Sequence, residues 1–273
     1  MKLPKHYGKC RICGKDAVLT YEHVPPKNAF NSHTVVEYSF DQVINMIGDS
    51  KRLPSDYSEI KGKYNQKGGG GYILCHSCNN NTGSWYMNEY VTFVNTLSDM
   101  IQKEGFKEET LYGFTLENLH PLRIFKAIIT MMCDTNQDCL GDNNLREFLL
   151  NKESNNFDSE KYQVYAYLVT PRSNRVTGRI VLGIKNCAEP VLLSEVSHYP
   201  IGFAMYIDKP KDFEPFGVNI NSLVHHTYEE KCNLVFPCMP YVNLHSKFPV
   251  DHITKDEMLK YVAASKPKNE ENN

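Results

Sequence analysis

The sequence lacks a long apolar segment and an excess of basic residues. No apolar run approaches the roughly 18 residues that a membrane-spanning helix needs. The opening residues, MKLPKHYGKC, contain no apolar stretch of the kind found in secretion signals. We therefore expect a cytoplasmic protein with no membrane partner. Lys and Arg number 30 against 32 Asp and Glu, for a formal net charge of −2, so bulk charge alone would not hold this chain on nucleic acid.

The composition is that of an ordinary globular protein. Of the 273 residues, 41% are hydrophobic and 23% are charged, and no internal repeat is visible. A chain of this length can bury a substantial core, and its length favours two domains. We predict an α+β protein with an N-terminal domain over residues 1–105 and a C-terminal domain over 106–273.

The N-terminal part is expected to contain short strands and one long helix. Strands are predicted over 17–21 and 72–74, where short apolar segments are followed by turn-forming or cysteine-rich sequence. From residue 77, apolar side chains recur at helical spacing until Gly105, which is a typical helix end. A further amphipathic helix is indicated over 39–49.

A polar segment of about residues 28–70 separates these strands and is predicted to be a long insertion. Its end, the glycine run from Gly68 to Gly71, is expected to be flexible. The segment is either a solvated loop or a mobile loop that contacts DNA. Four lysines in or beside it are candidate phosphate contacts: Lys27, Lys61, Lys63 and Lys67.

The C-terminal part changes from helical to strand-rich sequence. Helices are predicted over 120–134, where Pro121 suits the first turn, and over 143–151. Residues 160–240 are expected to form a mostly antiparallel sheet, and 256–264 a closing helix before a disordered tail. The predicted strand-rich segments are 162–170, 178–185, 199–208, 216–224 and 231–239.

Nine cysteines are present, and four of them form two CxxC pairs about 60 residues apart. The pairs are Cys10 with Cys13 and Cys75 with Cys78. Without a secretion signal, paired spacing of this kind favours metal over disulfides. Four thiolates satisfy a tetrahedral zinc ion completely, so we predict a closed, structural zinc site. The other five cysteines are most simply interpreted as small buried side chains.

Glu22 and His23 begin the run EHVPP nine residues after Cys13, and Asn79 directly follows Cys78. The combination resembles the HNH, or ββα-metal, endonuclease family. That family has a CxxC pair, an acidic residue and His followed by a hydrophobic residue and Pro, then CxxCN with a nearby Gly. The matching residues are Cys10, Cys13, Glu22, His23, Pro25, Cys75, Cys78, Asn79 and Gly83.

The resemblance implies a zinc-stapled, treble-clef-like ββα-metal module that hydrolyses DNA phosphodiester bonds. Glu22 and Asn79 would hold one Mg²⁺ or Mn²⁺ ion, and His23 would be the general base. The residue types suit this chemistry, because carboxylate and amide oxygens are hard ligands and a neutral imidazole accepts a proton from water. Neighbours on an extended strand point to opposite faces, which would let Glu22 face the metal and His23 the water.

Some assignments stay open. Asn79 could instead be only the N-cap of the long helix, and Asn81 is its main rival as metal ligand. The residue that usually positions the base in the family has no clear match, and Asn65 is the nearest candidate. A non-catalytic zinc-knuckle protein that binds nucleic acid or a partner is therefore the alternative.

The predicted C-terminal domain has no assigned role from sequence. It would select the substrate, mediate dimerisation or sense a partner. Proteins with similar motifs occur in bacterial defence against phage, so by analogy a homodimer or a second defence-system subunit is the expected partner besides DNA.

Overall fold

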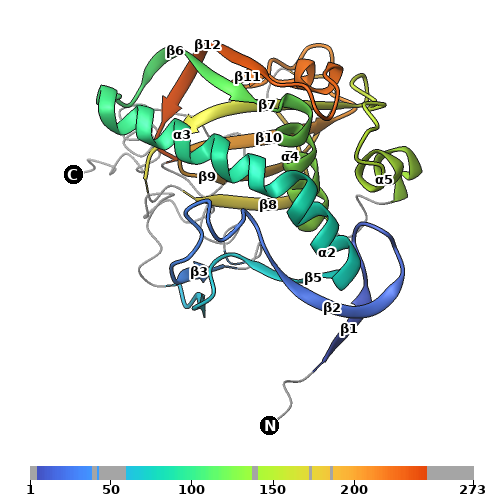
Figure 1. Ribbon diagram of the computed structural model, residues 1–273. Coiled ribbons are helices and arrows are strands. Elements are labelled where there is room, and N and C mark those ends of the chain that lie inside the picture. The colour runs from blue at the N-terminus through green and yellow to red at the C-terminus, as the bar shows by residue number, and fades with distance from the viewer. Residues whose placement is uncertain are drawn as a thin grey trace, which may run out of the picture.

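The computed structural model describes residues 5–38, 42, 60–136, 141–171, 174–184 and 187–244. The helices predicted over 39–49 and 256–264 lie outside these ranges, apart from Gln42, as does the predicted disordered tail. Over these ranges the chain is a mixed α+β protein with three sheets and a helical layer (Figure 1).

A three-stranded antiparallel sheet opens the fold, in the order β1–β2–β5. Its strands are β1 (His6–Lys9), β2 (Asp16–His23) and β5 (Gly70–Cys75). The predicted strands over 17–21 and 72–74 are the central parts of β2 and β5. Within the insertion, β3 (Val35–Glu37) and β4 (Lys63–Asn65) pair as a separate two-stranded sheet.

The predicted long helix follows β5 directly, in three consecutive parts. These are α2 (His76–Thr82), the π-helical turn η1 (Gly83–Met87) and α3 (Asn88–Glu104). Gly105 ends α3 in the left-handed conformation, with φ of 63°, as predicted from the sequence. The helix therefore carries the chain from the small sheet to the rest of the molecule.

Two more helices follow where the sequence places them. α4 (Pro121–Thr135) has Pro121 in its first turn, and most of its side chains are buried. α5 (Asn143–Leu150) is capped by Asp142, whose carboxylate accepts hydrogen bonds from the backbone N–H groups of Asn144 and Leu145. None of the helices in the described ranges is both long and apolar enough to cross a membrane.

A seven-stranded sheet forms the larger part of the fold, in the order β6–β12–β7–β10–β9–β8, with β11 paired to β7. All its pairings are antiparallel except that of β12 with β7. The prediction of a mostly antiparallel sheet is confirmed. The strands are β6 (Thr110–Leu119), β7 (Tyr162–Val169), β8 (Arg175–Leu182), β9 (Val191–His198), β10 (Ile201–Ile207), β11 (Val218–Asn219) and β12 (Cys232–Val242).

The sequence prediction missed β6 and β9 in this sheet, and β1, β3 and β4 elsewhere, and a full strand over 216–224 was wrong. That segment contains only β11 and a 3₁₀ turn, η3 (Asn221–His225). The Asn219 side chain accepts from the backbone N–H of Asn221, and the Asn221 side chain bonds the backbone of Tyr162 and Val164. Asparagine side chains thus take over backbone hydrogen bonds that a strand would have used.

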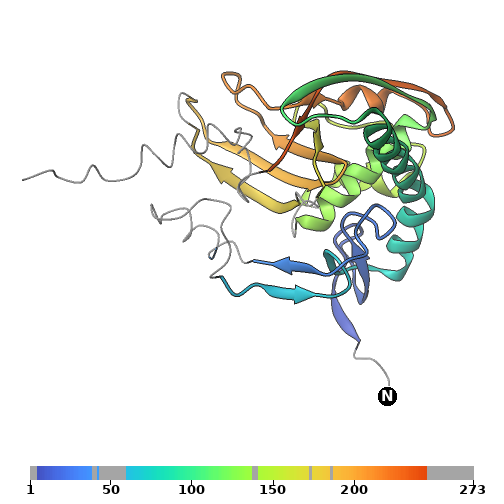
Figure 2. The same ribbon diagram turned by 90° about the vertical axis from the view of Figure 1, so that its left-hand side faces the viewer.

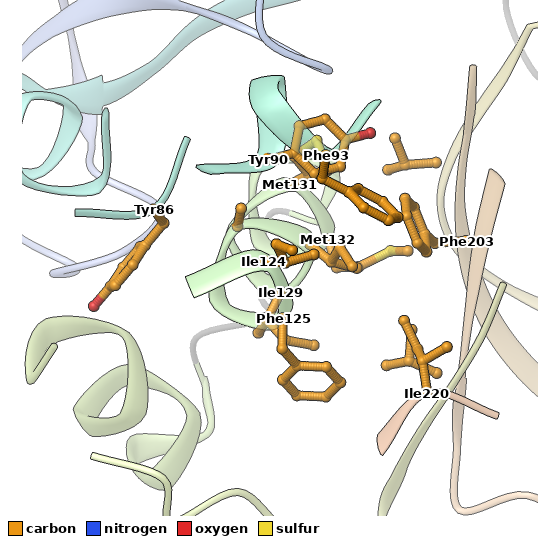
Figure 3. Packing of buried hydrophobic residues seen from close by; sticks show 14 of the residues in the cluster. Tyr86, Tyr90, Phe93, Ile124, Phe125, Ile129, Met131, Met132, Phe203 and Ile220 are labelled. Atoms are coloured by element: carbon orange, nitrogen blue, oxygen red, sulfur yellow. The ribbon is translucent and has the colours of Figure 1, made fainter. Parts of the chain in front are cut away.

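Helices α3 and α4 cover one face of the large sheet (Figures 1 and 2). Their aromatic and aliphatic side chains interlock with those of the strands, as Figure 3 shows for Phe93, Met132 and Phe203. One cluster of buried residues extends from Cys10 to Tyr241. The main core therefore includes residues from both sides of the boundary predicted at 105–106.

Candidate metal-binding and catalytic site

The four cysteines of the two CxxC pairs lie together at one end of the small sheet. The sulfur atoms of Cys10, Cys13, Cys75 and Cys78 all lie within 4.8 Å of one another, and Cys13 Sγ is 3.9 Å from Cys75 Sγ. Zinc–sulfur bonds of about 2.3 Å in tetrahedral geometry place sulfur atoms roughly 3.8 Å apart. The four thiols are free, so the cluster fits a zinc ion.

Local backbone structure places these sulfurs. Between β1 and β2 the chain makes a tight turn, in which Gly14 N–H donates to the Cys10 carbonyl and Cys10 N–H donates to the Lys15 carbonyl. Gly14 has φ of 70°, which glycine adopts without strain. Cys75 ends β5, and Cys78 lies in the first turn of α2. A bound ion would therefore join the β1–β2 turn to the start of the helix.

The remaining cysteines do not follow a single pattern. Cys133 is fully buried, as predicted, but Cys187 and Cys232 are half-buried and Cys238 is exposed. Cys139 lies outside the described residues. The prediction of five buried cysteines was therefore wrong for three of them: Cys187 lies in the loop before β9, Cys232 begins β12, and Cys238 lies at an irregularity in the pairing of β12 with β6.

Glu22 lies near the end of β2 on the side that faces α2. Its side chain is buried, with the residue only 9% exposed. Burial raises the pKa of this carboxyl group to about 7, although a hydrogen bond with Asn79 opposes the shift. Within the described part of the chain no cationic side chain shifts this pKa, and a buried carboxylate in such surroundings is suited to a metal cation.

Asn79 lies at the start of α2 and reaches back over β2. Its Nδ2 donates to Thr20 Oγ1 at 2.9 Å, and it also contacts Glu22. The N-cap of α2 is Cys75, so the alternative role of Asn79 as helix cap is wrong. Asn79, rather than Asn81, is the asparagine that bonds Glu22 among the described residues, and the Asn81 backbone carbonyl accepts from Ser84 Oγ in the following turn.

His23 follows Glu22 and points to the other side of β2, toward Tyr21. Its Nε2 lies 2.9 Å from the carbonyl oxygen of Lys67. Because a carbonyl only accepts, Nε2 carries the proton in this contact, and Nδ1 is the basic nitrogen. Burial lowers the pKa of His23, the Lys67 carbonyl opposes this, and the charges of Lys27 and Lys67 lower it further. The neutral, proton-accepting form is therefore favoured.

Asn65 holds the loop that carries the Lys67 carbonyl. Its Oδ1 accepts from Lys67 N–H at 3.1 Å, and its Nδ2 donates to the Tyr21 hydroxyl and to Glu37. The sequence suggested Asn65 as a stand-in for the family's base-positioning residue. In the structure Asn65 bonds the backbone N–H of Lys67, and His23 bonds the backbone carbonyl of the same residue. Asn65 therefore acts on His23 only through Lys67.

The glycine run is not a flexible linker, and that prediction was wrong. Gly70 and Gly71 belong to β5, opposite His23 and Glu22 of β2. A Cβ atom at Gly70 would lie 2.1 Å from the Glu22 carbonyl oxygen, and its φ of 149° favours glycine. The glycines therefore allow two backbones to approach closely beside the candidate site.

Asn31 is a site residue that the sequence analysis missed. It is 1% exposed, and its side chain bonds Gly69 through both the backbone N–H and carbonyl, as well as the Pro25 carbonyl. It thus fastens the chain after β2 to the glycine run. No motif singled it out, since its partners lie up to 38 residues away.

The four candidate lysines are all exposed but are not equivalent. Lys27 and Lys67 lie close enough to His23 to lower its pKa. The Lys67 ammonium also lies 4.9 Å from the centre of the Tyr21 ring. Lys61 and Lys63 belong to the insertion: Lys61 lies just before β4 and Lys63 is its first residue. Two lysines, rather than four, are thus placed beside the histidine.

No family model matches this chain, and neither a curated protein nor a solved structure matches it. The assignment of the site therefore depends on its own geometry and chemistry.

Proposed function

We propose that this protein is a metal-dependent endonuclease that hydrolyses DNA phosphodiester bonds. The supporting observation is that Glu22 and Asn79 are in contact and His23 follows Glu22 on β2, within a unit of two paired strands and a helix that meet at a four-cysteine cluster. The strand–strand–helix order agrees with the resemblance to HNH endonucleases, and the cysteine cluster would hold this small unit in one geometry.

His23 is the proposed general base. Its Nδ1 would take a proton from a water molecule while the Lys67 carbonyl holds the ring through Nε2. The lowered pKa keeps the imidazole neutral at physiological pH. Lys27 and Lys67 would attract the phosphate group, and Asn65 would hold the loop on which the ring depends.

Glu22 and Asn79 are the proposed ligands of one Mg²⁺ or Mn²⁺ ion. Such an ion, when bound, polarises the phosphate and stabilises the leaving oxygen. Mg²⁺ is commonly held by one or two carboxylates together with water and substrate phosphate, so a single Glu with an amide is sufficient. Asn79 must turn its amide so that Oδ1, rather than Nδ2, faces the ion.

The experiment is cleavage of supercoiled plasmid by the zinc-loaded protein with Mg²⁺, with Mn²⁺ or with neither. We expect cutting only with an added divalent ion. His23→Ala should lower the rate by about 10²–10⁴-fold, the contribution of general base catalysis. The matched control is His76→Ala, because His76 is an exposed histidine on α2 that contacts only Asn80 among the described residues.

Two outcomes would contradict the proposal: cutting that survives His23→Ala, or no cutting by the parent protein under any of these conditions. The second would favour the non-catalytic alternative. In that case, salt-dependent DNA binding would separate a nucleic-acid-binding protein from one that binds only a partner.

A further inference from the structure

A row of aromatic rings leads across the small sheet to His23. The His6 and Tyr72 rings stack with centroids 3.5 Å apart and planes within 17°. Tyr72 meets Tyr21 edge-on at 5.4 Å, and Tyr21 meets His23 edge-on at 5.0 Å. The four rings come from β1, β2 and β5, so the pairing of these strands assembles the row.

The outer part of this row is open to solvent. Tyr72 is 40% exposed, and His6 is exposed at the start of β1. Cross-strand aromatic pairs can stabilise a sheet by burying apolar area. These rings leave much of their surface in water, so they bury little apolar area and stabilise the sheet little. The rings are therefore available to another flat, apolar surface.

Positive charge accompanies the rings. The Lys67 ammonium lies 4.9 Å from the Tyr21 ring centre and 5.6 Å from that of Tyr72, and Lys5 is an exposed neighbour of His6. Glu22, on the same strand as Tyr21, is buried on the α2 side. Exposed rings with interleaved cations match a ligand that alternates flat bases with phosphates.

We propose that the ring row His6–Tyr72–Tyr21 binds the unpaired bases of single-stranded nucleic acid and leads the strand to His23. The inference deepens the proposed function and depends on it for the role of His23. A base in a duplex has both faces covered by its neighbours, whereas an unpaired base can stack on a protein ring. The substrate class is thus single-stranded DNA or RNA, or an unpaired segment within a duplex.

Binding can be measured without cleavage. The zinc-loaded full chain, with no Mg²⁺ or Mn²⁺ added, is titrated into fluorescent oligothymidylate and into an abasic strand of the same length, at one salt concentration. The abasic strand carries the same phosphates without bases, so the ratio of the two Kd values isolates stacking from charge. We expect oligothymidylate to bind about tenfold more tightly, corresponding to stacking of one base.

Variants locate the effect. Tyr72→Ala should bring the ratio close to one, and Tyr72→Phe should keep it because the ring remains. The matched control is Tyr7→Ala: Tyr7 is 74% exposed, follows His6 on β1 and points to the opposite face of the sheet. Zinc content and thermal midpoint show whether each variant is folded. If Tyr72→Ala does not fold, His6→Ala replaces it as the test variant, because His6 is exposed.

The proposal is overturned if the parent does not distinguish the two strands, or if the preference survives both Tyr72→Ala and His6→Ala. Tighter binding to a duplex than to either strand would also overturn it. If the protein prefers the strand with bases but never cuts DNA, the binding role of the ring row is supported and the proposed nuclease activity is contradicted. Cutting without a preference for bases would refute the ring row alone.

Discussion

At the scale of single residues, Lys67 influences His23 in two opposite ways. Its ammonium charge lowers the pKa of His23, while its backbone carbonyl, which accepts a hydrogen bond from the ring, raises it. A side-chain substitution removes only the first effect. The two contributions of one residue can therefore be separated experimentally.

We predict that Lys67→Met raises the pKa of His23. Losing a nearby positive charge favours the imidazolium ion, while the backbone hydrogen bond stays. The measurement is an NMR titration of the histidine ring in the zinc-loaded protein. Lys63→Met is the control, because Lys63 has no part in the shift of His23. An unchanged or lowered pKa in Lys67→Met would show that the charge does not act on the ring.

Asp142 links a helix cap to an ion pair. Burial raises the pKa of its carboxyl group, but hydrogen bonds from Lys161, Tyr162 and the Leu145 backbone outweigh that effect and lower the pKa to about 2. A group with a lowered folded-state pKa stabilises the fold above its unfolded-state pKa. That stabilisation is lost as the pH falls from about 4 to 2.

We predict that Asp142→Asn lowers the free energy of unfolding by about 1–2 kcal/mol at pH 7, and by progressively less toward pH 2. Asparagine remains a good N-cap, so the substitution removes mainly the charge. Urea unfolding at several pH values measures the effect. Lys161→Met should show a similar pH dependence, and the double variant should add little to either. Independent, additive effects would show that the two residues do not act as a pair.

At the scale of elements, the pairing of β2 with β5 determines where the candidate site residues lie. The register places Gly70 opposite His23 and Gly71 opposite Glu22. The two glycines differ sharply in the space around them. A Cβ atom at Gly70 would clash with backbone, whereas at Gly71 it would meet only the Ile73 side chain, at 3.4 Å.

We predict that Gly70→Ala destabilises the protein by about 2–4 kcal/mol, through its positive φ and the forced separation of the two strands. Gly71→Ala is the matched control and should cost much less. Urea midpoints compare the two variants, and DNA cleavage shows whether the site is displaced. Equal costs for both substitutions would mean that the close approach of the strands is not specific to Gly70.

The local sequence predicted elements well where pattern and end signals agree. Gly105 predicts where α3 ends, and Pro121 predicts where α4 begins. β9 was missed because Glu195 and two serines interrupt its apolar pattern, yet all three are buried in the sheet. Glu195 is bonded to Arg175 and Tyr167, so partners on other strands make a charged residue acceptable there.

At the scale of the whole molecule, the small sheet and the large one share a core. Arg11 donates to the Asp134 carbonyl, Tyr86 to that of Leu149, and Tyr228 to that of Trp85. Helices η1 and α3 pack against α4. The boundary predicted at residue 105 stays a prediction, but these contacts couple the two halves energetically.

We therefore predict one cooperative thermal unfolding transition for the zinc-loaded chain. Removing zinc with a chelator, or by Cys78→Ser, should lower its midpoint by about 10 °C, corresponding to roughly 3–5 kcal/mol. Calorimetry with metal analysis measures both. Two separate transitions in the loaded protein would instead support independent domains, and an unchanged midpoint without zinc would contradict a structural role for the ion.

What the sequence determined by itself was local. CxxC spacing, helical periodicity and end signals act over a few residues, so they predicted the cysteine pairs, the helices of the described residues and six of the twelve strands there. The motif around Glu22, His23 and Asn79 also suggested a hydrolytic site by its resemblance to HNH endonucleases, and that site stays a proposal.

Only the tertiary structure decided which groups meet. It brought the four cysteines within one cluster, placed Asn79 over β2 and gave His23 a backbone carbonyl from 44 residues away. It also made the glycine run part of a strand and assembled the ring row from three strands. These outcomes depend on strand register and on helix packing between distant segments, which local sequence patterns do not specify. A backbone carbonyl such as that of Lys67 also has no signature in the sequence, since every residue has one.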